Sequence, residues 1–358
     1  MRGTVVGSGH VRIMTYNSMN YGEDPERAEL VHEVIGQARA EASAAGDALV
    51  VAVQELIAED PAAGVRSARW FRRWWPRSGS RSKAGRAGWR LQTLAEATGL
   101  RCEYERNRPA VAVGSQRYHP GLLWSDELSP SGRFAVVSGR ALWHAYVQLD
   151  LDVGAAEPVA HASYHARPHG LNQRADEAEV VLKRVFRPPH QRPTLVGGDW
   201  NGVSADQAGA NVRVPDGWII APDYDRDPYH FRHGEPGRSV DWHREFAFQC
   251  RTWTNRDGSR GWEADRSAGQ ILRDGGLIDA AAILKAPWAA TVGHWDGDDV
   301  CGPRRLDIVR TTPDVVPALV SCEVIDSDLT RRASDHLPFV VKYAPAAIAA
   351  GSGGAADG

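Results

Sequence analysis

Isolated acids, amides and imidazoles stand beside apolar runs at widely separated places along the chain. The positions that could do chemistry are Asn17, Glu55, Asp199, Asn201, Asp307, Asp335 and His336. Apolar strands hold such groups rigidly, and the loops at strand ends are where α/β proteins build their sites. The pattern therefore predicts one polar site assembled from distant segments.

The run at residues 197–201 is the most specific of these signals. A single acid after a strand is often only a capping or turn residue. Here two glycines, which permit close backbone approach, end an apolar run and are followed by Asp199 and Asn201. The run predicts a carboxylate and an amide presented together from a buried strand.

The candidate ligands favour a hard divalent cation. Glu55, Asp199 and Asp335 offer only oxygen, which suits Mg²⁺ or Mn²⁺ better than zinc. Such an ion neutralises charge on a phosphoryl oxygen and stabilises a leaving oxygen. We therefore expect phosphoryl chemistry with Mg²⁺ as cofactor, Mn²⁺ being a possible substitute.

Strand and helix patterns alternate along the chain and must position these groups. Apolar runs predict strands at residues 11–17, 48–53, 110–113, 121–124, 141–149, 159–164, 194–198, 305–310 and 337–343. Helical spacing and caps predict helices from Pro25 onward and at residues 91–98, 172–186 and 268–274. We expect an α/β fold: a four-layer sandwich of two packed mixed β-sheets flanked by helices. One domain should span residues 1–343, and the small residues of 344–358 predict a disordered tail.

Composition excludes several classes of protein. With 42% hydrophobic and 24% charged residues, the chain of 358 residues is of the globular type. A net charge of -3 gives no global positive field for nucleic acid. Neither a secretory signal nor a membrane-spanning run is predicted. Four dispersed cysteines indicate reduced thiols, from which we expect a cytoplasmic location.

Residues 66–90 combine many arginines and tryptophans and contain no acid. This basic aromatic insert could bind a nucleic-acid strand through phosphate contacts and base stacking. An anionic membrane surface, or a solvated loop pinned by its aromatic residues, is the alternative. The candidate substrate contacts are Arg69, Arg72, Arg73 and Trp74 in this insert, together with Asn17 outside it.

Six short motifs together resemble those of the endonuclease/exonuclease/phosphatase superfamily, and they occur in the same order. They are Thr15-Tyr-Asn17, Val53-Gln-Glu55, Tyr164-His165, Gly198-Asp-Trp-Asn201, Arg305-Leu-Asp307 and Ser334-Asp-His-Leu-Pro338. The resemblance spans residues 11–343. A chance match of the whole ordered set is improbable.

The resemblance implies a role for each matching residue. Glu55 would be the principal metal ligand, and Asn17 and Asp335 would help to organise the metal site. Asp199 and Asn201 would orient the attacking water and the scissile phosphate. The remaining residues would act on the phosphate: His336, paired with Asp307, by binding it or moving a proton, and His165 by contacting an oxygen. The general base could be Asp199 or His336.

Some positions depart from the motifs. The family commonly has Thr-His-Leu around the first histidine, whereas residues 164–169 here carry a second histidine, His169, as a competitor for His165. Residues 202–290 match no motif. Within them, residues 251–254 could face substrate, although a buried Trp253 is the favoured interpretation. The histidines expected to be ordinary core or surface residues are His119, His144, His161, His230, His233, His243 and His294.

Taken together, these features predict a Mg²⁺-dependent phosphodiester hydrolase, a nuclease in which water attacks the phosphodiester in line. The alternative is a phosphoinositide, sphingolipid or small-molecule phosphoesterase built on the same core. A binding module that has lost catalysis is disfavoured because Glu55, Asp335 and His336 are all present.

Overall fold

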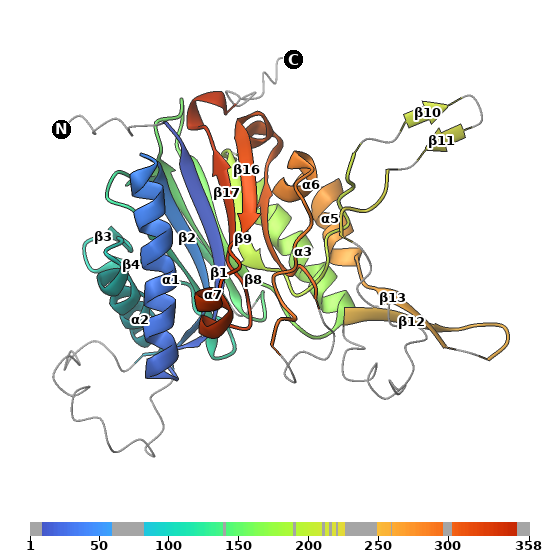
Figure 1. The fold of residues 1–358 in the computed structure, drawn as a ribbon, viewed down its shortest axis with the longest axis horizontal. Coiled ribbons are helices and arrows are strands. Elements are labelled where there is room, and N and C mark those ends of the chain that lie inside the picture. The colour runs from blue at the N-terminus through green and yellow to red at the C-terminus, as the bar shows by residue number, and fades with distance from the viewer. Residues whose placement is uncertain are drawn as a thin grey trace.

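Two mixed β-sheets pack face to face in the computed structural model of the chain (Figure 1). The structure describes residues 9–58, 82–138, 141–188, 191–209, 212–214, 217–219, 221–225, 249–258, 260–295 and 303–348. The first sheet has the order β16 (Leu319–Val324), β17 (Phe339–Tyr343), β1 (Val11–Tyr21), β2 (Ala48–Ile57), β5 (Tyr118–Trp124). The second has the order β14 (Ile278–Asp279), β15 (Asp307–Thr311), β9 (Thr194–Asp199), β8 (Val159–His165), β7 (Ala145–Asp152), β6 (Ser129–Val137).

Each sheet contains one parallel pair at its centre. β1 is parallel to β2, and β8 is parallel to β9, while the other neighbours in both sheets are antiparallel. The residues after all four parallel strands therefore emerge at one end of the sandwich.

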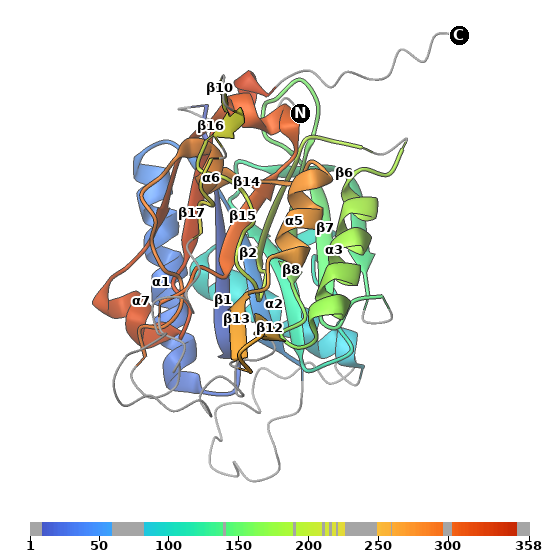
Figure 2. The ribbon, with the colours of Figure 1, turned by 90° about the vertical axis from the view of Figure 1, so that its right-hand side faces the viewer.

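Helices cover the outer face of each sheet, which gives four layers (Figure 2). The outer face of the first sheet packs on α1 (Pro25–Ala44) and α2 (Lys83–Thr98), and α7 (Asp328–Ala333) lies beside α1. The second sheet packs on α3 (Leu171–Val185) and α5 (Ser267–Asp274). A third apolar cluster fills the space between the sheets. The predicted sandwich is confirmed.

Local sequence signals account for the helix ends. Asp24 caps α1 by accepting hydrogen bonds from the backbone of Glu26 and Arg27, and Pro25 follows at the first helical position. Gly99 ends α2 at a φ of +66°, a left-handed conformation that favours glycine. The caps fix where the chain leaves each helix for the next strand.

The observed elements differ from the predicted ones in several places. Residues 110–113 form no ladder, because their backbone bonds alternately to Cys102 and to Pro120, leaving only an isolated bridge between Val111 and Gly121. Residues 141–144 precede β7 rather than belonging to it. The edge strands β6 and β16 were not predicted.

The described residues also form short elements outside the two sheets. They are the hairpins β3 (Glu103–Glu105)–β4 (Arg108–Pro109), β10 (Val212–Val214)–β11 (Gly217–Ile219) and β12 (Cys250–Thr254)–β13 (Arg260–Ala264), with α6 (Ala280–Leu284), η4 (Pro313–Ala318) and η5 (Pro345–Ala347). Pro345 is buried, so ordered chain reaches into the segment predicted as a tail, of which residues 349–358 lie outside the described part. Among the described helices, none combines the length and the apolar character needed to cross a membrane.

Candidate active site

The predicted polar residues meet at the end of the sandwich where the parallel strands finish. Asn17 lies on β1 and Glu55 on β2, in the first sheet. In the second sheet Asp199 at the end of β9 is paired in register with His165 of β8 on one side and Asp307 of β15 on the other. Strand register alone therefore brings an imidazole and two carboxylates together.

Asn17 joins the two halves of the site. Its side-chain amide donates to Glu55 Oε1 and to Asp199 Oδ2, both at 3.1 Å. Glu55 belongs to the first sheet and Asp199 to the second, so this buried amide crosses between the sheets. The Ser334 hydroxyl also donates to the Asn17 carbonyl at 2.8 Å, which ties the segment before β17 to β1.

Backbone strain concentrates at the site. Four of the six non-glycine residues with positive φ in the described part lie here: Met19, Asn20, Glu55 and Asn201. Glu55 has a φ of +67° and interrupts the regular pairing of β2 with both of its neighbours. A positive φ costs conformational free energy in a residue other than glycine. Such positions cluster where function requires a side chain to point in one direction.

Glu55 and Asp335 suit a Mg²⁺ ion. Glu55 Oε2 accepts a hydrogen bond of 2.9 Å from the backbone of Asn20, and burial together with the nearby Asp335 carboxylate raises the pKa of Glu55. A cation would relieve both causes of that shift. Within the described residues no three His, Cys, Asp or Glu side chains are arranged to hold a metal by themselves. Mg²⁺ commonly takes only one or two carboxylates and keeps several waters, so the residues fit it.

His336 forms the other side of the site with Asp307. Its Nδ1 is 2.7 Å from Asp307 Oδ2, and Asp307 in turn has its backbone N–H bonded to the Thr291 hydroxyl. Burial opposes a charge on His336, but the surrounding carboxylates, Asp307 first, raise its pKa well above the ordinary value. The surrounding carboxylates therefore favour the protonated form of His336.

Asp199 sits between the two histidines. Its Oδ2 is 3.4 Å from His165 Nε2 and 3.9 Å from His336 Nε2, and its Oδ1 accepts from the Asn201 backbone at 2.9 Å. Burial raises the pKa of Asp199 to about 7, against the lowering effect of His336. A carboxylate with this pKa can exchange a proton near neutral pH.

His165 rests on a second histidine that sequence reasoning missed. His144, at the residue before β7, stacks on it with ring centroids 3.9 Å apart and an angle of 13°. Burial, with His144 and His336 nearby, lowers the pKa of His165 well below its ordinary value. The competing His169 is exposed and lies outside this group. The register of β7 against β8 places His144 here, and no spacing in the sequence signals it.

The basic aromatic insert is only partly described. The predicted contacts Arg69, Arg72, Arg73 and Trp74 lie outside the described residues. Residues 83–90 form the first turns of α2, where Arg86 and Arg90 donate to the carbonyls of Ala58 and Ile57. These two side chains hold the last residue of β2 and the residue that follows it.

Three buried aspartates within residues 202–290 form ion pairs with arginines of β15 and of the segment before it. Arg305 binds Asp225 and Asp279, and Arg310 binds Asp206, all with buried side chains. These pairs fix the chain that follows Asn201. The favoured interpretation of Trp253 as buried is wrong: it is 45% exposed, because it lies on the projecting β12–β13 hairpin.

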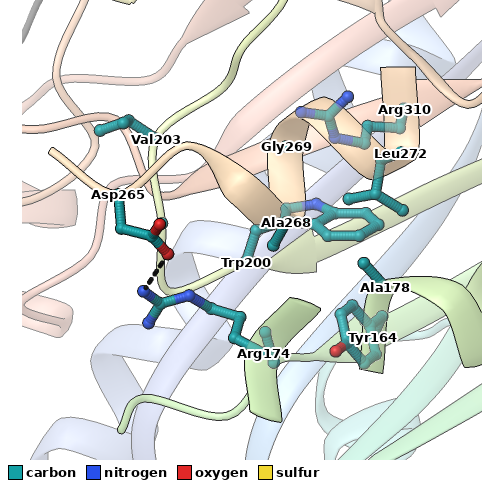
Figure 3. A pocket seen from close by; sticks show the side chains of 12 residues that line it. Tyr164, Arg174, Ala178, Trp200, Val203, Asp265, Ala268, Gly269, Leu272 and Arg310 are labelled. Atoms are coloured by element: carbon teal, nitrogen blue, oxygen red, sulfur yellow. Dashed lines mark hydrogen bonds and ion pairs between the residues drawn. The ribbon is translucent and has the colours of Figure 1, made fainter. Parts of the chain in front are cut away.

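A small cavity lies behind the site, between α3, α5 and β9 (Figure 3). Trp200 and Tyr164 line it, and the ion pair between Arg174 and Asp265 stands at one side. Its volume of about 10 Å³ is room for one water. It is therefore packing space behind Asp199 and too small for a substrate.

Comparison with known proteins identifies the fold. No family model matches the chain. Solved structures of endonuclease/exonuclease/phosphatase proteins match from Bacteroides vulgatus (TM-score 0.52, 13% identity, 93% of this chain and 98% of that one) and Leptotrichia buccalis (0.50, 13%, 93% and 99%). A conserved protein of unknown function from Enterococcus faecalis also matches (0.51, 13%, 92% and 98%). The chain has the endonuclease/exonuclease/phosphatase fold.

A curated protein shares a shorter stretch. Over 134 residues the chain is 29% identical to the prolyl oligopeptidase dbiP from Dendrothele bispora. The match covers 32% of this chain and spans 18% of that protein. A match this short carries nothing of that protein's activity to this chain.

Proposed function

We propose that this protein is a Mg²⁺-dependent phosphodiester hydrolase whose substrate is a polynucleotide. One observation carries the proposal: Asn17 joins Glu55 to Asp199, and Asp199 lies within 3.9 Å of His336. A carboxylate suited to a metal, a carboxylate suited to accept a proton and an imidazole thereby lie close together at the strand ends. The fold and the six ordered motifs support the same class of reaction.

Each side chain has a distinct task in this proposal. Glu55, with Asp335 and Asn17 beside it, would hold the Mg²⁺ ion. When bound, the ion supplies charge neutralisation at a phosphoryl oxygen. The His336 imidazolium, oriented by Asp307, donates a hydrogen bond to another phosphoryl oxygen.

Asp199 is the proposed general base. Its pKa of about 7 suits it to take a proton from the attacking water, whereas the raised pKa of His336 favours a ring that is already protonated. Asn201 holds Asp199 through its backbone N–H, and its side-chain amide is fixed on the Ala166 carbonyl at 3.0 Å. The buried His165 places its Nε2 3.4 Å from Asp199 Oδ2, and burial lowers its pKa.

Substitution of Glu55 by Gln tests the proposal. The Glu55→Gln variant keeps the shape of the side chain but removes the charge that would bind the metal, so we expect Mg²⁺-dependent hydrolysis of bis(p-nitrophenyl) phosphate to be abolished. Glu96→Gln, an exposed position on α2, is the matched control and should retain full turnover. Melting curves verify that both variants fold. Unchanged turnover by Glu55→Gln would refute the assigned role.

A substrate panel tests the polynucleotide part. The protein should cleave single- or double-stranded DNA or RNA in Mg²⁺, and EDTA should stop the reaction. Phosphoinositides and other phosphorylated small molecules form the comparison set. Release of lipid head groups, with every polynucleotide left intact, would overturn the polynucleotide assignment and leave the hydrolase standing.

A further inference from the structure

Arg167 lies two residues beyond His165, next to the catalytic groups. Its guanidinium carbon stands 4.1 Å from the ring centroid of Trp143, and its Nε donates to the His169 carbonyl at 2.7 Å. Among the described residues, the Glu177 carboxylate is near enough for the charge of Arg167 to lower its pKa, but no described contact between the two side chains is an ion pair. A cation stacked on an indole and lacking a described ion-pair partner is suited to an incoming anion.

Glu177 holds this pair in place. The buried carboxylate accepts from the backbone N–H of both Trp143 and Arg167, the latter at 3.0 Å, and from the Tyr164 hydroxyl at 2.9 Å. One side chain of α3 therefore fixes the segment before β7 and the segment after β8. The stacked pair is preorganised by this arrangement.

The β12–β13 hairpin is rooted beside the same segment. Asp265, at its base, accepts from Arg174 at 3.3 Å and from Arg251 at 3.0 Å, and Arg174 also donates to the carbonyl of Pro168, the residue after Arg167. Figure 3 shows the Arg174–Asp265 pair between α3 and the chain leading out of the hairpin. The hairpin and the Arg167 segment thus share one buried guanidinium.

Trp253 is presented openly on that hairpin. It is paired in register with Gly261 and its ring lies over this glycine, where a Cβ would come within 2.3 Å of the indole. Its Nε1–H donates to Asn255 Oδ1 at 2.9 Å, which fixes the ring, and the side chain remains 45% exposed. The hairpin projects away from the body of the molecule (Figure 1). A rigid, exposed indole of this kind can stack on a planar ligand.

From these contacts we propose that Arg167, Trp143 and Trp253, here named the β8 flank, bind the part of a polynucleotide that leads away from the scissile phosphate. This inference rests on the proposed function and specifies how the same site takes its substrate. Arg167 binds a neighbouring phosphate and Trp253 stacks on a base farther along the strand. Strands of five residues extend about 16 Å, enough to reach past several nucleotides, and aromatic stacking tolerates any base.

Binding of a labelled oligonucleotide tests the β8 flank without catalysis. Fluorescence anisotropy in EDTA measures the Kd of the full-length protein for single-stranded and duplex oligonucleotides over a series of salt concentrations. Trp253→Ala should weaken binding by about tenfold or more, and Trp253→Phe, which keeps an aromatic face, should restore most of it. Arg167→Gln should weaken binding and lower the slope of log Kd against log salt by about 1.

A charge-matched control distinguishes binding at the β8 flank from a general effect of the protein's net charge. Arg101 is exposed, and its backbone forms an isolated bridge with Trp124. Trp124 lies at the opposite end of β5 from Tyr118. Arg101→Gln therefore removes one positive charge far from the site. It should leave both the Kd and the salt slope unchanged. Loss of the same affinity in Arg101→Gln and Arg167→Gln would contradict a localised surface.

The outcomes distinguish this inference from the proposed function. If the wild type cleaves polynucleotides while the Trp253 and Arg167 variants bind them as tightly as it does, the β8 flank is overturned and the function stands. A wild type that hydrolyses bis(p-nitrophenyl) phosphate but neither binds nor cleaves any polynucleotide overturns the flank and the substrate class together. Oligonucleotide binding that depends on Trp253, in a protein without hydrolytic activity, would support the flank alone.

Discussion

At the scale of single residues, burial and neighbouring charges together set the pKa of each titratable group at the site. Three nearby carboxylates raise the pKa of His336, whereas burial and the neighbouring imidazoles lower the pKa of His165. Asp199 lies between the two, with its pKa raised to about 7. The pKa values of two chemically identical rings therefore shift in opposite directions because their surroundings differ.

The Asp307–His336 pair gives the first prediction at this scale. Asp307→Asn keeps the size of the side chain but removes the charge that raises the pKa of His336, so kcat should fall by about 10²- to 10⁴-fold with little change in KM. The double variant with His336→Gln should be no worse than His336→Gln alone, because the two residues act as a unit. A loss of less than tenfold in Asp307→Asn would contradict this dependence.

Most of the polar residues were predictable because each follows or precedes an apolar strand that the sequence reveals. What escaped prediction depends on register. His144 meets His165 only because Ala145 is the residue paired with His165, a pairing that no spacing in the sequence records. Trp253 was predicted to be buried, since nothing in residues 251–254 shows that their hairpin projects from the body.

At the scale of elements, β9 is built for close approach. A Cβ on Gly197 would stand 2.9 Å from the Ala52 Cβ and 3.0 Å from the Thr15 Cβ, both of the opposite sheet. A Cβ on Gly198 would stand 2.4 Å from the Tyr164 carbonyl oxygen of β8. Gly197 therefore sets how near β9 comes to the first sheet, and Gly198 sets how near it comes to β8.

Gly197→Ala should destabilise the protein by about 1 to 3 kcal/mol, because the added methyl forces the sheets apart in a packed core. Gly36→Ala is the matched control: it lies within α1 with open space around it, and should stabilise by about 0.5 to 1 kcal/mol. Urea unfolding of both variants measures the difference. Equal stability of the two would contradict the packing of β9 described above.

The helices were the more predictable elements, because caps such as Asp24 and Gly99 act locally. Strands that depend on distant partners were less so. β6 is half-exposed at an edge, and Pro130 and Gly132 break its alternation, so only its pairing with β7 defines it. Residues 110–113 carry an apolar pattern but lack a continuous partner.

At the scale of the whole molecule, buried polar contacts fix one sheet against the other. Besides the Asn17 bridge, Gln54 donates to the Ser163 hydroxyl at 3.0 Å, and His161 shares a hydrogen bond of 2.8 Å with Tyr343. Apolar packing alone allows the sheets to slide, whereas such directional contacts favour one arrangement. The two halves of the candidate site are thereby kept in register.

His161 predicts how stability depends on pH. Burial lowers its pKa to about 4 from an unfolded value of 6.5, so between these values the unfolded chain binds more protons. Stability should therefore fall as pH drops from 6.5 through 4, with about 3 kcal/mol of the loss due to this residue. Urea unfolding of His161→Gln across that range should show a correspondingly weaker pH dependence. Identical pH dependence in variant and wild type would contradict it.

We propose that the polar ends of the two sheets together hold one divalent cation at Glu55. Anomalous diffraction from crystals soaked in Mn²⁺ tests it most directly. We expect a strong anomalous peak about 2 Å from a Glu55 carboxylate oxygen, on the side facing Asp335 and Asp199. A strong Mn²⁺ peak elsewhere, with none at Glu55 in a protein that hydrolyses phosphodiesters in Mn²⁺, would contradict it.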